Sequence, residues 1–385
     1  MANDKSFKVK NGLSAKRYLQ SGSALGYSDV DVSSGSYFTK TLAANTTLTF
    51  SNPPPSGSAS SFALEITGAD VAVGWDFANA SYDSVSFSVA TQSTQPSSLF
   101  FKSDGTKMYV CDGYWSVIHQ YSLSTAWDTS TASYDNISYD TTLSNIRALY
   151  FKPDGTAFFT TDTATGFVRS FSLSTAWDLS STISAGSTLN TNTQTGASVV
   201  GLFFKSDGTK LYVADFSADD INEYNLSTAW DLSTASFNQV SSSISSYVNI
   251  SAYGSIYFKS DGTYMYIVDV GTNEVDEFTL STAWDISTLS HVTQFSVASQ
   301  DTDPTGIYFK DDGTKMYIIG YSSDAVYQYT TEASAPATVT YPSSVKWSGA
   351  TTPDAPAGGE KDLYVFVTTD GGTTYYGKQA GDALA

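Results

Sequence analysis

Two short motifs recur at nearly constant spacing along this chain, and they constrain its fold more than any other feature. The motif Phe-Lys-x-Asp-Gly-Thr occurs five times, at 101–106, 151–156, 204–209, 258–263 and 309–314. A Trp-Asp pair, set in LSTAWD four times and in VAVGWD once, alternates with it, at Trp75, Trp127, Trp177, Trp230 and Trp284. Each series repeats about every fifty residues, a period typical of repeat architectures.

One repeat predicts four antiparallel strands. GLFFK (201–205) is an apolar run, and the Asp-Gly that follows it is a strong hairpin turn leading into KLYVAD (210–215). DINEYNL (220–226) follows a variable loop, and LSTAWD then turns the chain into a fourth strand around 235–242. Five such units predict an all-β protein with a five-bladed β-propeller. The Trp residues of the repeat are expected to be packing anchors.

The early VAVGWD copy predicts how the ring closes. It is followed by SYDSVSFSV (81–89), an outer strand that comes before any complete inner strand. The last unit, residues 306–330, has only three strands and no Trp-Asp after it. We therefore expect the strand at 81–89 to complete the last blade and to remove the open sheet edges.

The chain outside the repeats predicts a second domain. Residues 34–70 and 333–385 have the alternating pattern of strands and are expected to form one small, discontinuous, β-sandwich-like domain. In it, SFALEIT (61–67) is expected beside ATVTY (337–341). The propeller, residues 71–332, would then be an insert, which is tolerated where the termini of the inserted domain lie close together. Residues 1–33 are expected to be an N-terminal attachment segment containing Lys8, Lys10, Lys16 and Arg17.

Composition excludes several classes of function. The chain has 38 acidic and 19 basic residues, a net charge of −19, which argues against nucleic-acid binding and against anionic membrane surfaces. Cys111 is the single cysteine, so no disulfide can form within the chain. The N-terminal residues have no apolar core of a signal peptide, and no run approaches 18 apolar residues. We therefore expect no membrane insertion.

Residues outside the propeller resemble a viral family. The stretches FKVKNGLSAKRYLQ (7–20), GSYFTKTLAANTTLTFSNPPPSGSASSFALEITG (35–68) and VTYPSSVKW with DLYVFVTTDGGTTYYG (within 339–377) are similar to the framework of virion appendage proteins of marine tailed bacteriophages. The resemblance implies a non-enzymatic fibre or decoration protein, made in the host cytoplasm and exposed on the released virion. Its implied partners are other virion proteins, bound through the termini and the small β-domain, and a homotrimer is expected by analogy.

The blades resemble a different group, the YVTN- and lactonase-like β-propellers, and this likeness indicates fold rather than activity. Together, the two resemblances imply that the propeller binds a host-surface glycan or protein. Two alternatives stay open: a purely structural module that contacts other virion proteins, and a glycan depolymerase.

The sequence offers little for catalysis. Strand two of each repeat ends at Asp112, Asp162, Asp215, Asp269 or, in the last, Gly320, which raises the question of a carboxylate ring in the channel. Glu223 and Glu277 share a position on strand three that is expected at the surface. The two histidines lack the spacing of zinc ligands. We therefore expect no catalytic residue, metal or cofactor.

The variable loops are the expected recognition surface. Loops between strands two and three and between strands four and one open on one face and differ from blade to blade, whereas the turns of the opposite face are nearly invariant. Exposed aromatic and polar side chains in such loops are suited to binding a ligand. The candidate ligand-binding residues are Tyr114, Trp115, His119, Arg147, Phe216 and Tyr253.

Overall fold

The chain forms two compact units of β structure. The computed structural model describes residues 23–25, 28–241, 244–250 and 253–384. One unit comprises Met1–Ala72 with Ser334–Ala385, and the other comprises Val73–Ala333. The chain passes from one unit to the other twice, in β7 (Asp70–Val73) and in β28 (Ala333–Pro336), and these two strands pair with each other. Most of the expected attachment segment, residues 1–22, lies outside the described residues.

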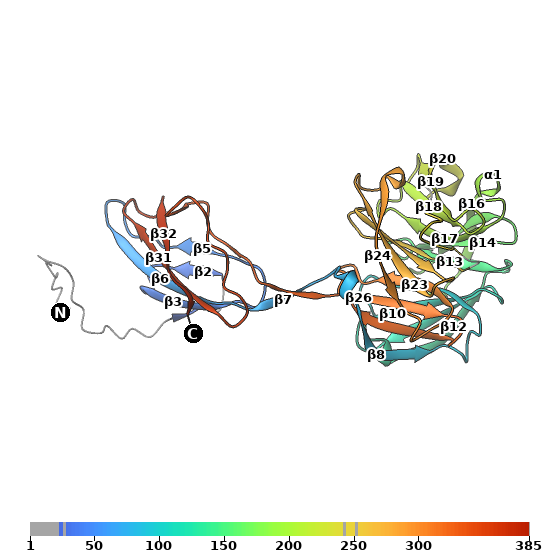
Figure 1. Cartoon of the computed structure of the whole chain (residues 1–385), viewed down its shortest axis with the longest axis horizontal. Coiled ribbons are helices and arrows are strands. Elements are labelled where there is room, and N and C mark those ends of the chain that lie inside the picture. The colour runs from blue at the N-terminus through green and yellow to red at the C-terminus, as the bar shows by residue number, and fades with distance from the viewer. Residues whose placement is uncertain (1–22, 26–27, 242–243, 251–252, 385) are drawn as a thin grey trace, which may run out of the picture. The chain divides into compact units, whose positions relative to one another are not determined.

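The smaller unit is built on a six-stranded sheet that joins both ends of the chain (Figure 1). Its strand order is β1 (Ser23–Ala24), β3 (Tyr37–Thr41), β6 (Ser60–Thr67), β31 (Lys361–Thr368), β32 (Tyr375–Leu384) and β30 (Val345–Trp347). Alternate apolar residues of β6 and β31 face one core, where Phe62 stacks on Phe366 with ring centroids 5.0 Å apart. This packing ties together two halves that the sequence separates by the whole propeller.

One expected pairing in this unit is wrong. The strand β6 lies between β3 and β31, not beside 337–341. The short strand β29 (Val339–Thr340) instead pairs with β4 (Thr46–Thr47), and β2 (Asp29–Asp31) pairs with β5 (Thr49–Ser51). The eight residues of β31 offer β6 a longer ladder and more matching apolar side chains than the two residues of β29 can.

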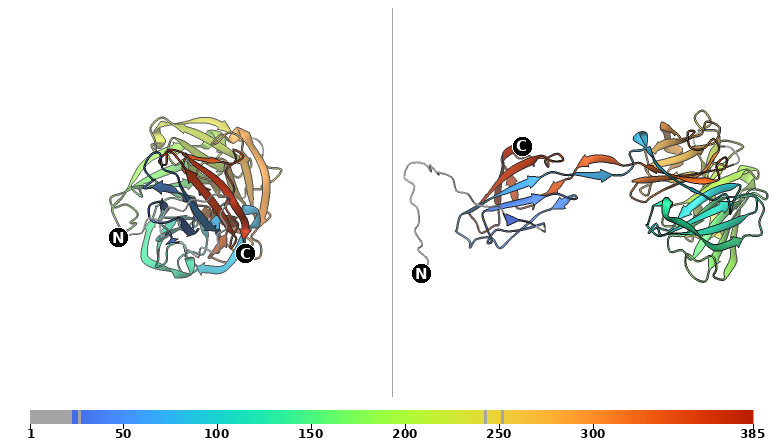
Figure 2. Two further views of the ribbon diagram at one scale, coloured as in Figure 1. Left: turned by 90° about the vertical axis from the view of Figure 1, so that its left-hand side faces the viewer. Right: turned by 90° about the horizontal axis from the view of Figure 1, so that it is seen from below.

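The larger unit confirms the predicted five-bladed propeller, since its described residues form five antiparallel four-stranded sheets. Figure 2 shows the sheets following one another around this unit in sequence order. The inner strands are β9 (Pro96–Phe101), β13 (Ile146–Phe151), β17 (Val199–Phe204), β21 (Ile256–Phe258) and β25 (Pro304–Phe309). The second strands are β10 (Lys107–Asp112), β14 (Ala157–Asp162), β18 (Lys210–Asp215), β22 (Tyr264–Asp269) and β26 (Lys315–Gly320).

The outer strands complete the blades. The third strands are β11 (Val117–Leu123), β15 (Phe167–Leu173), β19 (Asp220–Leu226), β23 (Glu274–Leu280) and β27 (Ala325–Thr330). The fourth strands are β12 (Ala132–Asp140), β16 (Ile183–Asn190), β20 (Ala235–Val240), β24 (Leu289–Ser296) and β8 (Ser81–Ser88). Short helical turns are η1 (Phe77–Asn79), η2 (Thr129–Thr131), α1 (Asn192–Thr195), η3 (Leu232–Thr234) and η4 (Ile286–Thr288).

The ring closes as the early Trp-Asp copy predicts. Strand β8 pairs antiparallel with β27, with Ser88 opposite Ala325 and Ser81 opposite Thr330. In Figure 1 the teal β8 accordingly lies with the orange-red strands of the last blade. The salt bridge between Lys315 and Asp83, with an N–O distance of 2.7 Å, adds a polar link to the same blade. Closure thus joins residues more than 230 positions apart.

The repeated tryptophan is a structural anchor. The backbone N–H of Trp127 donates to the carbonyl of Gly105 at 3.1 Å, and its indole ring stacks on Phe101 with centroids 5.6 Å apart. Gly105 has φ +72°, and a Cβ there would lie 2.5 Å from the indole ring, so only glycine fits the turn beneath it. Asp128 caps the next turn by accepting from the N–H of Ser130 at 3.0 Å. The Trp-Asp pair therefore has a structural role: the tryptophan packs on the Asp-Gly turn, and the aspartate caps the turn that follows.

Polar groups also link neighbouring blades. The hydroxyl of Tyr109 on β10 donates to the carbonyl of Trp177 in the next blade at 2.6 Å, and Gln120 accepts from the N–H of Leu179 at 3.0 Å. The expectation that the strand-three position of Gln120, Glu223 and Glu277 is at the surface is wrong, because all three are buried. Gln120 thus bonds the next blade, whereas Glu223 accepts from Asn238 and Gln239 of its own blade, at 2.9 Å each.

Candidate functional site

Five aromatic side chains close the centre of the propeller. Each inner strand contributes one residue at the same position of the repeat, and neighbouring rings meet edge to face with centroids 5.1 to 5.6 Å apart. The ring consists of Phe100, Tyr150, Phe203, Tyr257 and Tyr308. This aromatic ring divides the central channel of the propeller, so that the channel has one mouth on each side of the ring. We call the mouth at the Asp-Gly turns the hairpin side and the mouth at the variable loops the loop side.

Arg147 is a cation at the loop-side mouth. It is the second residue of inner strand β13, and its guanidinium carbon lies 4.1 Å from the ring centroid of Tyr253. Its Nε and Nη1 atoms are buried without a hydrogen-bond partner, and none of the ion pairs among the described residues includes it. A Cβ on Gly113 would lie 2.4 Å from Nη1, so the glycine leaves room for the guanidinium. Unpaired buried donors favour an acceptor from a ligand.

Arg147 and Tyr253, two of the six candidate ligand-binding residues, contact each other in the structure. Tyr253 stacks on its other neighbour, Tyr321, with centroids 5.9 Å apart and planes inclined by 14°. The guanidinium thus rests on an aromatic platform that holds its plane and orientation. The arrangement presents a fixed cation at the mouth of the channel of an acidic protein.

Tyr114 and Trp115 form a second exposed pair on the loop side. Their rings meet edge to face at 4.9 Å, and their side chains are 59% and 66% exposed. Asp112 fixes their loop because its Oδ1 accepts from both backbone N–H groups, at 3.0 Å and 2.7 Å. Their role in binding a ligand stays a prediction.

The other two expected residues are less accessible. His119 is buried on β11, with its ring 5.9 Å from that of Tyr134, and burial lowers its pKa. Phe216 is half-buried and packs against the apolar cluster that contains Val200 and Ile221. Both side chains contribute to the packing of their blades, and their expected role in recognition stays a prediction.

The aspartates at the ends of the second strands cap loops. Asp215 accepts from the N–H of Ser217 at 2.8 Å, and Asp269 accepts from the N–H of Gly271 at 2.8 Å. Such bonds hold the loop between strands two and three. Asp162 differs, because its Oδ2 atom accepts from the hydroxyl of Thr165 at 2.6 Å and its Oδ1 atom is buried without a hydrogen-bond partner. Bonding to the adjacent loop accounts for the repetition of these aspartates.

Two carboxyl groups on the loop side have raised pKa values. Burial and the charge of Asp215 raise the pKa of Asp220 to about 6. Burial, followed by the charges of Asp301 and Asp112, raises the pKa of Asp324, and the Oδ1 atom of Asp324 is buried without a hydrogen-bond partner. A carboxylate with a raised pKa is a better proton acceptor near neutral pH than an ordinary one. The sequence showed no signal for these shifts, because they arise first from burial, which only the folded chain decides.

The described part of the chain contains no group of three or more His, Cys, Asp or Glu side chains placed to hold a metal ion. It also contains no helix long and apolar enough to cross a membrane.

A comparison with protein families decides which family contains this propeller. The model of the family described as "Lactonase, 7-bladed beta-propeller" matches residues 116–384, well over half of the chain. This chain belongs to that lactonase family. It differs from the family's description in blade number, because its described residues form five blades. No curated protein sequence matches the chain.

Several solved structures resemble this lactonase-family chain. A candidate 6-phosphogluconolactonase from Bacteroides uniformis is 16% identical, with a TM-score of 0.36 over 70% of this chain and 80% of that one. A candidate 6-phosphogluconolactonase from Bacteroides fragilis is 13% identical, with a TM-score of 0.35 over 71% and 79% of the two chains. A Lactobacillus plantarum protein is 14% identical, with a TM-score of 0.40 over 61% and 67%. Likeness at this level carries no argument about activity.

The family match corrects the function expected from the sequence. A non-enzymatic virion appendage, with its structural and depolymerase alternatives, rested on the framework residues outside the propeller. The match spans most of the propeller and continues to residue 384, through the second part of that framework, and it names a lactonase family. The framework residues alternate because they form a packed β-sheet, a pattern that many unrelated proteins share. No finding tests the expected virion partners, the homotrimer or the location on the virion, and these stay predictions.

Proposed function

We propose that this chain is a hydrolase that opens a small lactone at the loop-side mouth of the channel. The observation that carries the proposal is Arg147, whose Nε and Nη1 atoms are buried at this mouth without a hydrogen-bond partner. Membership of the lactonase family supplies the class of reaction. The lactone would have to be small, because the aromatic ring of the channel closes the site from below.

Arg147 would act on the carbonyl oxygen of the lactone. Attack by water converts this oxygen into an oxyanion, and N–H donors already directed at it stabilise the transition state more than the substrate. Because Tyr253 holds the guanidinium 4.1 Å from its ring centroid, little reorganisation is needed when the charge develops. Ring opening leaves a hydroxy acid, whose carboxylate pairs well with a guanidinium.

Asp324 is the candidate acceptor for the proton of the attacking water, and it would return this proton to the ring oxygen as the bond from that oxygen to the carbonyl carbon breaks. It lies in the loop between β26 and β27, which opens on the same side as Arg147. Its raised pKa and its unpartnered Oδ1 atom suit a group that takes up a proton near neutral pH. Asp215 and Asp269, which end their second strands, already accept from the N–H groups of their own loops.

The experiment is lactone hydrolysis by the purified full chain, followed by acid release in a pH-stat. The panel contains five- and six-membered aliphatic lactones and aldonolactones. Arg147→Ala should lower kcat/KM by about a hundredfold, as expected for the loss of one oxyanion donor. Asp324→Asn should lower kcat and remove the lower limb of the pH profile.

Arg169→Ala is the matched control, because the Arg169 guanidinium is already paired with Asp162 at 3.0 Å and lies over the Phe167 ring. It should leave hydrolysis unchanged. Wild-type chain that releases no acid from any lactone above the buffer rate would show that the hydrolase proposal is wrong. Equal activity of Arg147→Ala and wild type would exclude Arg147 as the oxyanion donor.

A further inference from the structure

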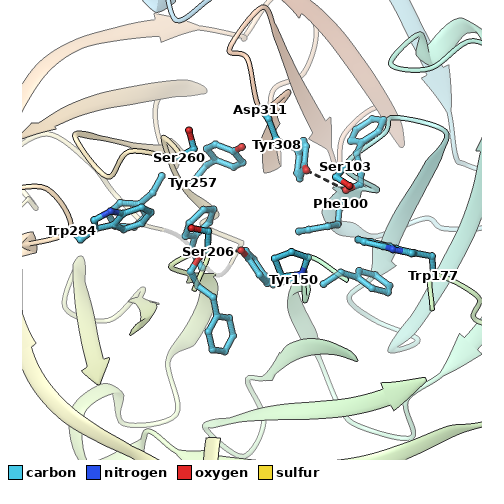
Figure 3. Close-up of a pocket in the computed structure, with 16 residues that line it drawn as sticks. Phe100, Ser103, Tyr150, Trp177, Ser206, Tyr257, Ser260, Trp284, Tyr308 and Asp311 are labelled. Carbon is cyan, nitrogen blue, oxygen red and sulfur yellow. Dashed lines mark hydrogen bonds between the residues drawn. The ribbon is translucent and has the colours of Figure 1, made fainter. Parts of the chain in front are cut away.

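A second cavity lies on the opposite, hairpin side of the aromatic ring. It has a volume of about 260 Å³, and Figure 3 shows Phe100, Tyr150, Tyr257 and Tyr308 around its centre. The indole rings of Trp177 and Trp284 extend its wall. Phe203 of the third blade also lines the cavity, so all five blades contribute to its wall around the axis of the propeller.

The floor of this cavity has no free polar group among its tyrosines. The hydroxyl of Tyr150 donates to the carbonyl of Phe204 at 3.1 Å, and that of Tyr257 donates to the carbonyl of Phe309 at 3.0 Å. The hydroxyl of Tyr308 donates to the carbonyl of Phe101 at 3.2 Å in the same way. The surface that the tyrosines present to the cavity is therefore aromatic carbon, which binds apolar groups and, at the faces of the rings, cations.

The rim carries one unbalanced charge. The variable residue of Phe-Lys-x-Asp-Gly-Thr lines the rim in every blade, and these residues are Ser103, Pro153, Ser206, Ser260 and Asp311. Asp311 makes no hydrogen bond or ion pair with any other described residue, and the adjacent Lys310 is paired with Asp312 at 2.6 Å. The fifth blade therefore places a single carboxylate beside the aromatic floor, next to Tyr308 in Figure 3.

The electrostatics agree with this position. Burial, and then the charge of Asp312, raise the pKa of Asp311. Burial raises the pKa values of Tyr150 and Tyr257, and the charge of Asp311 adds to the effect in both. The carboxylate thus acts on hydroxyls of two other blades, and a bound cation would relieve its unfavourable environment.

We propose that this cavity binds a small organic cation, an alkylammonium or quaternary ammonium ion, with its hydrocarbon groups on the aromatic floor and its charge toward Asp311. An anion would be repelled by the carboxylate. A sugar would place hydroxyls against a floor whose tyrosines have no free donor or acceptor, and each unpaired hydroxyl would cost affinity. A cation with methyl groups meets neither obstacle.

The test compares choline with its uncharged isostere, 3,3-dimethylbutan-1-ol, by calorimetric titration of the full chain. Choline should bind about tenfold or more tightly than the isostere, because only the cation gains from the rings and the carboxylate. Asp311→Ser should weaken choline binding by about fivefold and leave the isostere unchanged. Three other blades carry serine at this position, so this variant should fold.

Two further variants sharpen the result. Ser206→Asp adds a second carboxylate to the rim and should tighten choline binding, whereas Asp354→Ser removes an exposed carboxylate of the other unit and should have no effect. Equal affinity for choline and its isostere, equal choline affinity of Asp311→Ser and wild type, or no saturable choline binding at millimolar concentration would each overturn the proposal. Arg147→Ala, at the other mouth, should keep choline binding, so failure of the lactonase proposal is distinguishable.

Discussion

The carboxylate of Asp301 occupies the place that an aspartate side chain would take at Gly320. A Cβ on Gly320 would lie 2.0 Å from the Cγ atom of Asp301. The Oδ1 atom of Asp301 accepts from the N–H of Asp303 at 2.7 Å, and its Oδ2 atom accepts from the N–H of Ser323 at 3.0 Å. The fifth blade thus keeps the carboxylate that caps the loop in the other four, but takes it from the preceding loop.

Because Asp301 supplies the carboxylate that is missing at Gly320, the stability of a double variant at these two positions can be predicted. Gly320→Asp alone should destabilise the propeller by about 2 to 3 kcal/mol, because the new side chain overlaps Asp301 and places two carboxylates together. Asp301→Gly combined with Gly320→Asp should recover most of the loss, because it restores the arrangement of the other blades. Urea unfolding followed by tryptophan fluorescence measures both. Additive losses in the double variant would contradict the exchange.

The close approach of Gly208 and Trp230 predicts a large effect of one methyl group. A Cβ on Gly208, which has φ +73°, would lie 2.3 Å from the indole ring of Trp230. Gly208→Ala should lower the free energy of unfolding by about 2 to 4 kcal/mol, because strain in the left-handed conformation adds to the overlap. Gly196→Ala is the control, since Gly196 has φ +56° but nothing within 4 Å of its Cβ position. It should cost only about 1 kcal/mol. Thermal unfolding measures both variants, and equal losses of stability in Gly208→Ala and Gly196→Ala would exclude an effect of the overlap with Trp230.

The closing strand predicts cooperative loss of the ring. Deletion of residues 77–90 removes β8 and leaves β27 as an open edge. The propeller should then unfold at a markedly lower urea concentration, and exposed edges should promote association of chains. Circular dichroism with size-exclusion chromatography measures both effects. An unchanged unfolding midpoint would mean that the last blade is stable without its fourth strand.

Asp220 predicts a dependence of stability on pH. Its pKa in the folded chain is raised to about 6, so between pH 4 and pH 6 the folded state binds more protons than the unfolded state. Stability contributed by this group is therefore present at low pH and is lost as the pH rises through 6. Asp220→Asn should stabilise the propeller at pH 7.5 by about 1 kcal/mol, a value reduced for solvent screening of this half-exposed group. The gain should vanish at pH 4. A gain of equal size at both values would contradict the assignment.

The repeat was sufficient to predict the propeller because each motif specifies local geometry. The Asp-Gly turn sets a hairpin, and the glycine and tryptophan of one blade contact each other within about thirty residues, as Gly105 and Trp127 do. The count of copies then gives the number of blades, and the early copy gives the closing strand. Exposed loop aromatics such as Trp115 could also be located, because loops that differ between repeats lie at the surface.

The sequence failed where residues of different blades meet. The strand-three position of Gln120 is expected from the sequence at the surface, but Gln120 is buried and accepts from the N–H of Leu179 in the next blade at 3.0 Å. Asp301 gave no signal as a substitute for a residue missing at position 320. The resemblance of the framework strands to a viral family pointed to a role that the match to the lactonase family overturned.

The sequence alone thus determined the all-β class, the five blades and the place where the ring closes, because these depend on contacts within one repeat or between identical repeats. Only the tertiary structure decided which side chains share a site. Arg147 meets Tyr253 across more than a hundred residues, and Asp311 faces aromatic rings from the other blades. Closing a ring brings to one axis residues that are distant along the chain, and no local pattern records which of them will be neighbours.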